Sequence, residues 1–111
     1  MDENDRRLPF LEEQQQILKE EIKNLREDIE YFEDLLEKMR GEYQRGRDEN
    51  RDSSLLYDLE VKGKALKQQL LQYQREKNQK VTLFRQIREE YEELLYAKNL
   101  LLSEKIKRNS F

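Results

Sequence analysis

The residues whose types and spacing could bind a metal ion lie near the middle of the chain. Asp48, Asn50 and Asp52 match positions 1, 3 and 5 of a calcium-binding EF-hand loop. Such a loop also needs Gly at position 6 for its sharp turn and a bidentate Glu at position 12. Here these positions hold Ser53 and Leu59. The stretch is therefore interpreted as a solvated loop followed by a helix cap.

This chain lacks two of the side-chain types that most often perform general acid–base and nucleophilic catalysis. It contains no His and no Cys, and so lacks the commonest general base, thiolates and disulfides. Asp and Glu are abundant, but catalysis needs groups that converge in a pocket that excludes water. Helices with one narrow apolar stripe enclose no such pocket. We therefore expect a protein that is not an enzyme, with no cofactor, no metal and no small-molecule substrate.

Positive charge is concentrated between Val61 and Arg88. This segment holds eight Lys and Arg residues, and Glu76 is its one acidic residue. Nucleic-acid binding requires basic groups along one track, where they neutralise successive phosphates. Here the basic residues are spread around the helix, and the whole chain has a net charge of −3. Nucleic-acid binding is therefore a less favoured interpretation.

Composition indicates long helices rather than a thick globular core. Of the 111 residues, 42% are charged and 35% are hydrophobic, and Gly and Pro together number four. Average soluble domains have roughly 25% charged residues. The apolar residues recur periodically, which distinguishes this chain from a disordered one.

The sequence carries no signal for export or membrane insertion. No run reaches the ~18 apolar residues of a membrane span, and the polar segment MDENDRRLPF does not resemble a signal peptide. The absence of Cys fits a reducing compartment. We expect an intracellular, cytoplasmic protein, with the nucleus as an alternative.

The first part of the chain has the apolar spacing of a coiled coil. From Leu18 to Tyr43, apolar residues recur at alternating intervals of four and three, the heptad pattern. Pro9 suits the first turn of a helix, where no backbone N–H is needed. We expect a coiled-coil helix over residues 8–44, after a polar tail of residues 1–7. Its predicted seam residues, which face the partner helix, are Leu11, Leu18, Ile22, Leu25, Ile29, Phe32, Leu36 and Met39.

A polar segment should end this helix. Residues 44–54 include no apolar side chain, and Gly46 lies within them, where Gly costs about 1 kcal/mol in a helix interior. Good N-cap residue types follow. The candidates are Asp52, Ser53 and Ser54.

A second coiled-coil helix is predicted over residues 54–107, after a loop at 45–53 and before a tail at 108–111. Its heptad pattern is displaced by one residue, a slip that a loop absorbs without distortion. One long helix in a parallel dimeric coiled coil is the alternative. The predicted seam residues here are Leu56, Leu59, Leu66, Leu70, Tyr73, Phe84 and Ile87. Three lysines interrupt the pattern and are interpreted as snorkelling side chains, or alternatively as residues that set the register: Lys77, Lys80 and Lys98.

Charge favours an all-α, long-helix antiparallel coiled-coil hairpin. The first 50 residues have a net charge of −7 and the remaining 61 have +4, so antiparallel helices place opposite charges side by side. In the preferred register, the numbers of opposed residues sum to 95. Phe32 then meets Gly63, a match of a large side chain with a small one. A slip of one heptad, to a sum of 102, is rejected because it places Lys80 on Ile22.

The end of the second helix, residues 89–107, is rich in Leu and extends beyond the first helix in this register. Contiguous exposed apolar patches usually mark interaction sites. We therefore expect another chain to cover it, either a second copy in a homo-dimer or a coiled-coil hetero-partner. Packing within the chain and binding to a membrane surface are the alternatives. The predicted protein-interface residues are Tyr91, Leu94, Leu95, Lys98, Leu101, Leu102 and Ile106.

These features favour a non-enzymatic coiled-coil module for protein–protein interaction. It would act as a scaffold or structural subunit of a larger assembly. The alternative is a rod-like fragment of a filament or tethering protein.

Overall fold

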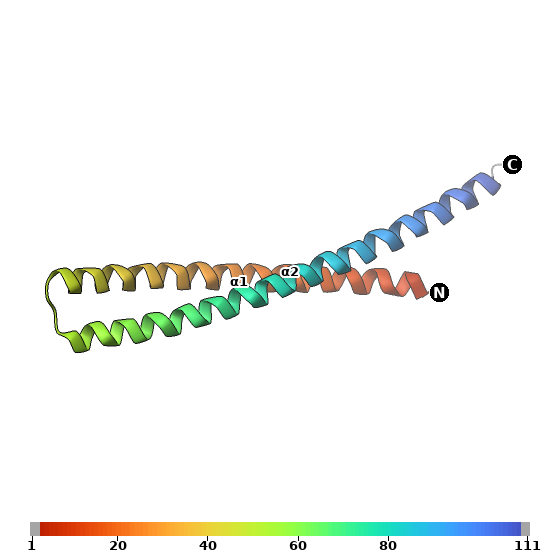
Figure 1. The fold of residues 1–111 in the computed structure, drawn as a ribbon. Helices are drawn as coiled ribbons and strands as arrows, with labels where there is room; N and C mark the ends of the chain where they lie inside the picture. The colour runs from red at the N-terminus through yellow and green to blue at the C-terminus, as the bar shows by residue number, and fades with distance from the viewer. Residues whose placement is uncertain (1–2, 110–111) are drawn as a thin grey trace. The chain divides into compact units, whose positions relative to one another are not determined.

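The computed structural model describes residues 3–109, which form two long helices (Figure 1). Helix α1 comprises Glu3–Asp48 and helix α2 comprises Ser53–Asn109. The predicted all-α hairpin is confirmed. The alternative of one continuous helix is wrong, because α1 ends at Asp48 and α2 starts separately.

The chain reverses direction over residues 49–52 through a Schellman motif without Gly at its left-handed position. Asn50 has a φ of 52°, a conformation that Asn tolerates better than most residues other than Gly. The backbone N–H of Arg51 donates to the carbonyl of Gly46 at 2.9 Å, and that of Asn50 donates to the carbonyl of Arg47 at 3.3 Å. These hydrogen bonds satisfy carbonyls that the end of a helix otherwise leaves unpaired.

Asp52 caps the start of α2, as one of the three predicted candidates. Its carboxylate accepts a hydrogen bond from the backbone N–H of Ser54 at 3.1 Å, and its carbonyl accepts one from the N–H of Leu55 at 3.1 Å. The Schellman motif and this cap together occupy residues 49–52, so the loop is shorter than the predicted loop at 45–53. Arg45 and Arg47 remain in the last turn of α1, where their charge complements the helix dipole.

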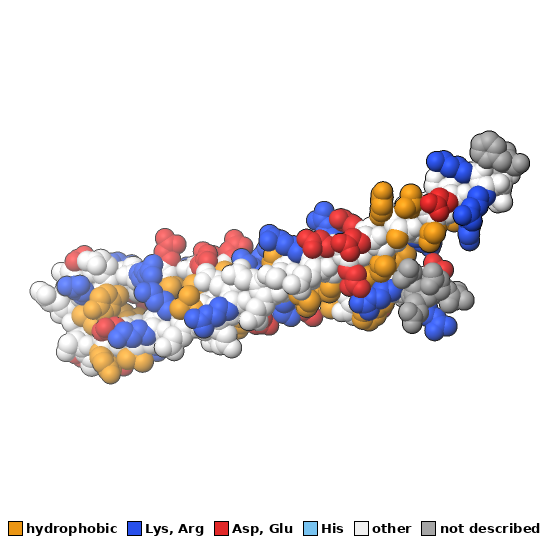
Figure 2. Space-filling model, turned by 45° about the vertical axis from the view of Figure 1, so that its right-hand side comes forward, with side chains coloured by type: hydrophobic (Ala, Val, Ile, Leu, Met, Phe, Trp, Pro, Cys, Tyr) orange, Lys and Arg blue, Asp and Glu red, His pale blue; other side chains and the backbone are white. Residues whose placement is uncertain are grey.

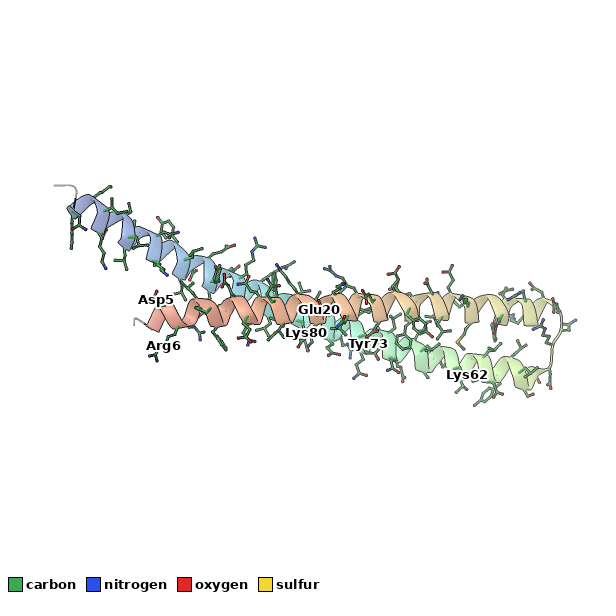
Figure 3. All side chains as sticks on the ribbon, turned by 180° about the vertical axis from the view of Figure 1, so that it is seen from behind. Asp5, Arg6, Glu20, Lys62, Tyr73 and Lys80 are labelled. Carbon is green, nitrogen blue, oxygen red and sulfur yellow. The ribbon has the colours of Figure 1, made fainter. Side chains whose placement is uncertain are left out.

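The chain divides into two compact units. The hairpin unit comprises Ile22–Gln79 and contains the loop, and the terminal unit comprises Met1–Glu21 with Lys80–Phe111. In the hairpin unit, the ring centroids of Phe32 and Tyr73 lie 5.3 Å apart. Figure 3 labels Tyr73 on α2.

The register within the hairpin unit differs by one heptad from the predicted one. Phe32 packs on Tyr73 rather than opposite Gly63. Gly46 and Leu56 lie close together, and their numbers sum to 102 rather than 95. A Cβ added at Gly46 would lie 2.7 Å from Leu56 Cδ2. The missing side chain of Gly46 therefore lets Leu56 approach α1 just beside the loop, in the register that was rejected.

In the terminal unit, the start of α1 lies beside α2. The predicted polar tail is helical from Glu3 onward, while the first two and last two residues of the chain lie outside the described part. Arg7 Nε donates to Glu90 Oε1 at 2.7 Å, and Lys98 Nζ lies 3.3 Å from Asp5 Oδ1. These pairs between oppositely charged side chains explain why a polar segment belongs to the helical pairing.

The apolar core of the described chain lies along α1. Seven apolar side chains are buried there, whereas no residue of α2 is buried. The predicted seam residues of α2 are half-buried, as are Phe32 and Met39 of α1. The buried residues are Leu8, Leu11, Leu18, Ile22, Leu25, Ile29 and Leu36.

Candidate functional site

The first residues of the predicted interface take part in packing within the terminal unit. Tyr91, Leu94 and Leu95 are half-buried, and Leu11 of α1 is only 2% exposed. The hydroxyl of Tyr91 donates a hydrogen bond to Glu12 Oε1 at 3.0 Å. This hydrogen bond is the main reason that the pKa of Tyr91 is raised, with partial burial and the charge of Glu12 adding to it. The protein's own α1 thus covers part of the predicted interface.

The end of α2 exposes the remaining apolar residues of the predicted interface. Leu101 is 55% exposed, Leu102 is 48% and Ile106 is 66%. Leu100, which was not predicted, is 49% exposed. We call these four side chains the C-terminal surface, and Figure 2 shows uncovered hydrophobic side chains near this end of α2. A helix segment that is apolar on more than one side is expected to be enclosed.

Charged segments stand on both sides of the C-terminal surface along α2. The acidic run EEYEE (residues 89–93) precedes it, and the basic run KIKR (residues 105–108) follows and overlaps it at Ile106. Within the acidic run, Glu90 pairs with Arg7, and this hydrogen bond, together with the charge of Glu90, raises the pKa of the Arg7 guanidinium. The helix therefore changes from negative to apolar to positive along its last turns.

Lys80 and Lys98, which interrupt the apolar pattern, both reach acidic side chains of α1. The Lys80 side chain is 26% exposed and its ammonium group pairs with Glu21, and Lys98 pairs with Asp5. Lys80 is labelled in Figure 3. The methylene stem of such a lysine can pack on an apolar stripe while its ammonium group stays outside the stripe. A lysine in the apolar pattern is therefore compatible with the observed register, contrary to the prediction.

An open groove in the hairpin unit was not predicted. It forms beside Gly63, where an added Cβ would meet nothing within 4 Å. The predicted match of Phe32 with Gly63 would have filled this space, and the heptad shift leaves it open. The groove is lined by Leu36, Met39, Arg40, Tyr43, Gln44, Leu59, Glu60, Gly63, Lys64 and Lys67.

The residues with partial EF-hand spacing have other contacts. Asp52 caps α2, and Asp48 accepts a hydrogen bond from Gln44 Nε2 at 3.2 Å. Within residues 3–109, no group of three or more His, Cys, Asp or Glu residues could hold a metal ion. No helix in this described range is long and apolar enough to cross a membrane.

Comparison with known proteins found no family model, no curated protein and no solved structure that matches this chain. The geometry is therefore the basis for a functional assignment. The end of α2 is distinguished by exposed apolar area between an acidic and a basic segment. Such an area is suited to binding another polypeptide.

Proposed function

We propose that this protein is a non-enzymatic coiled-coil interaction module that binds another protein chain through the C-terminal surface. Its role would be that of a scaffold or structural subunit in a larger assembly. The observation that supports this proposal is the exposure of Leu100, Leu101 and Leu102 at consecutive positions of one helix. Fully burying a Leu side chain is favourable by about 1.5–3 kcal/mol. Because these residues are about half exposed, a partner that covers them would be stabilised by a substantial part of this free energy for each leucine.

We also propose where this assembly forms. The absence of Cys from the whole chain supports a reducing compartment, such as the cytoplasm. The hairpin forms without a disulfide, the cross-link that is typical of proteins in oxidising compartments.

The test compares two double variants with the unaltered protein. Leu101→Gln with Leu102→Gln removes apolar area from the C-terminal surface without changing charge, and Gln is a good helix former. Leu55→Gln with Leu71→Gln is the matched control, because these leucines of α2 are 56% and 52% exposed. Tagged versions are made in cells, and their size in extracts is measured by size-exclusion chromatography.

We expect the unaltered protein and the control to elute in a complex larger than the 13.7 kDa chain. The variant of the C-terminal surface should elute as the free chain. Elution of all three as free chains would refute the proposed function. Elution of all three in the same complex would show that binding uses another surface and would refute the role of this one.

A further inference from the structure

The C-terminal surface has features that identify its partner. We propose that the partner is a second copy of this chain, and that the ends of the two α2 helices pair antiparallel. This inference rests on the proposed function and specifies it further. Two features of the sequence around the surface support it, a stripe of apolar residues and the distribution of charge.

The stripe consists of Leu95, Asn99, Leu102 and Ile106. These residues recur at intervals of four, three and four, so they lie on one face of the helix. Leu95 is half-buried, and the other three are exposed. Two such stripes fit together when the pair is centred between Asn99 and Leu102. Leu102 of each chain then lies opposite Asn99 of the other, and Leu95 lies opposite Ile106.

Charge sets the direction of the pairing. Residues 89–93 include four Glu, whereas residues 105–108 include three basic side chains. Figure 2 shows acidic and basic side chains on either side of the uncovered hydrophobic ones. In the antiparallel pair, Glu93 of one chain is level with Arg108 of the other, so the end of each acidic run meets the end of the partner's basic run. A parallel pair would place each run beside its own copy, and like charges across an interface oppose association.

The position of Asn99 is consistent with this register. A polar residue at one core position of a coiled coil can specify register and partner number. In the antiparallel pair, the two Asn99 residues lie on either side of the two-fold axis and are offset along the helices by only three residues. Because a two-fold interface uses the same surface on both copies, the pairing closes at a dimer.

The first part of the test measures the mass of the purified full chain by light scattering over a range of concentrations. We expect the mass to rise from 13.7 kDa toward twice that value. Leu102→Gln should shift this transition to at least tenfold higher concentration, while the control Leu55→Gln leaves it unchanged. A dimer that Leu102→Gln does not weaken would refute the inference.

The second part determines the direction of the helices with single cysteines, which the natural chain lacks. Glu92 and Asn109 extend the stripe at its two ends and lie opposite each other in the antiparallel pair. Glu92→Cys and Asn109→Cys are oxidised separately and as an equal mixture. Identical positions lie about 25 Å apart in the antiparallel pair, so we expect the mixed disulfide to dominate. Efficient linkage of each variant to itself would indicate a parallel pair and refute the inference.

Failure of this inference can be distinguished from failure of the proposed function. A purified chain that stays at 13.7 kDa and forms no disulfide at any concentration refutes the second copy as partner. If Leu101→Gln with Leu102→Gln still releases the chain from a complex in extracts, the proposed function stands and the partner is a different protein. If the extracts also show no complex, both proposals are wrong.

Discussion

Helices α1 and α2 are antiparallel partners, yet they use their apolar residues differently. Helix α1 buries seven apolar side chains, and α2 buries none. Of the thirteen large hydrophobic side chains that are exposed in the described chain, ten belong to α2. On α1 most of the apolar residues follow one stripe, whereas on α2 they are distributed around the helix. One partner helix can cover one stripe, so α2 has more apolar area than α1 can cover.

The interruptions of the α2 stripe contribute to this difference. Gly63 presents no side chain to α1, and Lys77 and Lys80 are half-buried where an apolar residue would be expected. Within the terminal unit, the same contrast separates Leu11, which is buried, from Leu94, which is half-buried. The two helices should therefore differ in how strongly single apolar residues stabilise the fold.

The largest expected effect comes from a matched pair of substitutions in the terminal unit. Leu11→Ala removes a side chain that is 2% exposed and should lower the free energy of unfolding by about 2–5 kcal/mol. Leu94→Ala removes the same atoms from a half-buried site and should cost about half as much or less. Urea denaturation followed by circular dichroism measures both, at protein concentrations low enough to limit self-association. Equal losses would contradict the contrast between the helices.

The fold class and the position of the turn could be predicted from local pattern alone. Heptad spacing predicted both helices, and the polar run of residues 44–54 predicted a loop, with Asp52 as one of three candidates for the cap. The register could not be predicted in the same way. A heptad pattern matches itself after a shift of seven residues, so the two registers differ only by a few contacts. The contact of Gly46 with Leu56, which accompanies the observed register, was not foreseen.

The error in register also changed the predicted interface. In the predicted register, α1 did not cover residues 89–107 of α2. In the structure, α1 begins at Glu3, and Asp5 pairs with Lys98. Of the predicted interface residues, Lys98, Leu101, Leu102 and Ile106 are therefore left exposed. Leu100 was left out because it points away from the other leucines. Exposure on several sides of a helix is a signal that a search for one stripe does not find.

A second prediction concerns two glycines of the hairpin unit. Gly63→Ala should raise the free energy of unfolding by about 1 kcal/mol, because Ala favours a helix interior over Gly by that amount. An added Cβ at Gly63 also meets nothing within 4 Å. Gly46→Ala gains the same helix propensity, but its Cβ would lie 2.7 Å from Leu56 Cδ2. The Leu56 side chain must then move, so this substitution should stabilise less or destabilise.

Thermal and urea denaturation of the two glycine variants measures this difference. Because helix propensity cancels between them, the remaining difference reports how closely α2 approaches α1 at each site. A Gly46→Ala variant as stable as Gly63→Ala would mean that the helices do not meet closely beside the loop. The contact of Gly46 with Leu56 would then not favour the observed register.

The smallest expected effect is a dependence of stability on pH at Tyr91. Its pKa is raised by the hydrogen bond to Glu12, by partial burial and by the charge of Glu12. The neutral hydroxyl is thus favoured in the folded state. Its contribution to stability is fully present below the ordinary pKa of Tyr, about 10, and is lost as pH rises through the raised pKa. The stability of the protein relative to Tyr91→Phe should therefore be constant below about pH 10 and fall above it.

Glu12→Gln provides the control for this prediction. It retains an oxygen that can accept the hydrogen bond but removes the carboxylate charge, so the fall in stability above about pH 10 should become shallower. Urea midpoints measured from pH 8 to pH 11 for the protein and both variants give the comparison, and the titration of Lys cancels in the differences. A fall that is unchanged by Glu12→Gln would mean that the charge of Glu12 does not perturb Tyr91. A fall that persists in Glu12→Ala, which also removes the hydrogen bond, would mean that burial, not the contact with α1, perturbs Tyr91. The half-buried residues of α2 would then be covered more completely than their exposure indicates, which would weaken the contrast between the two helices.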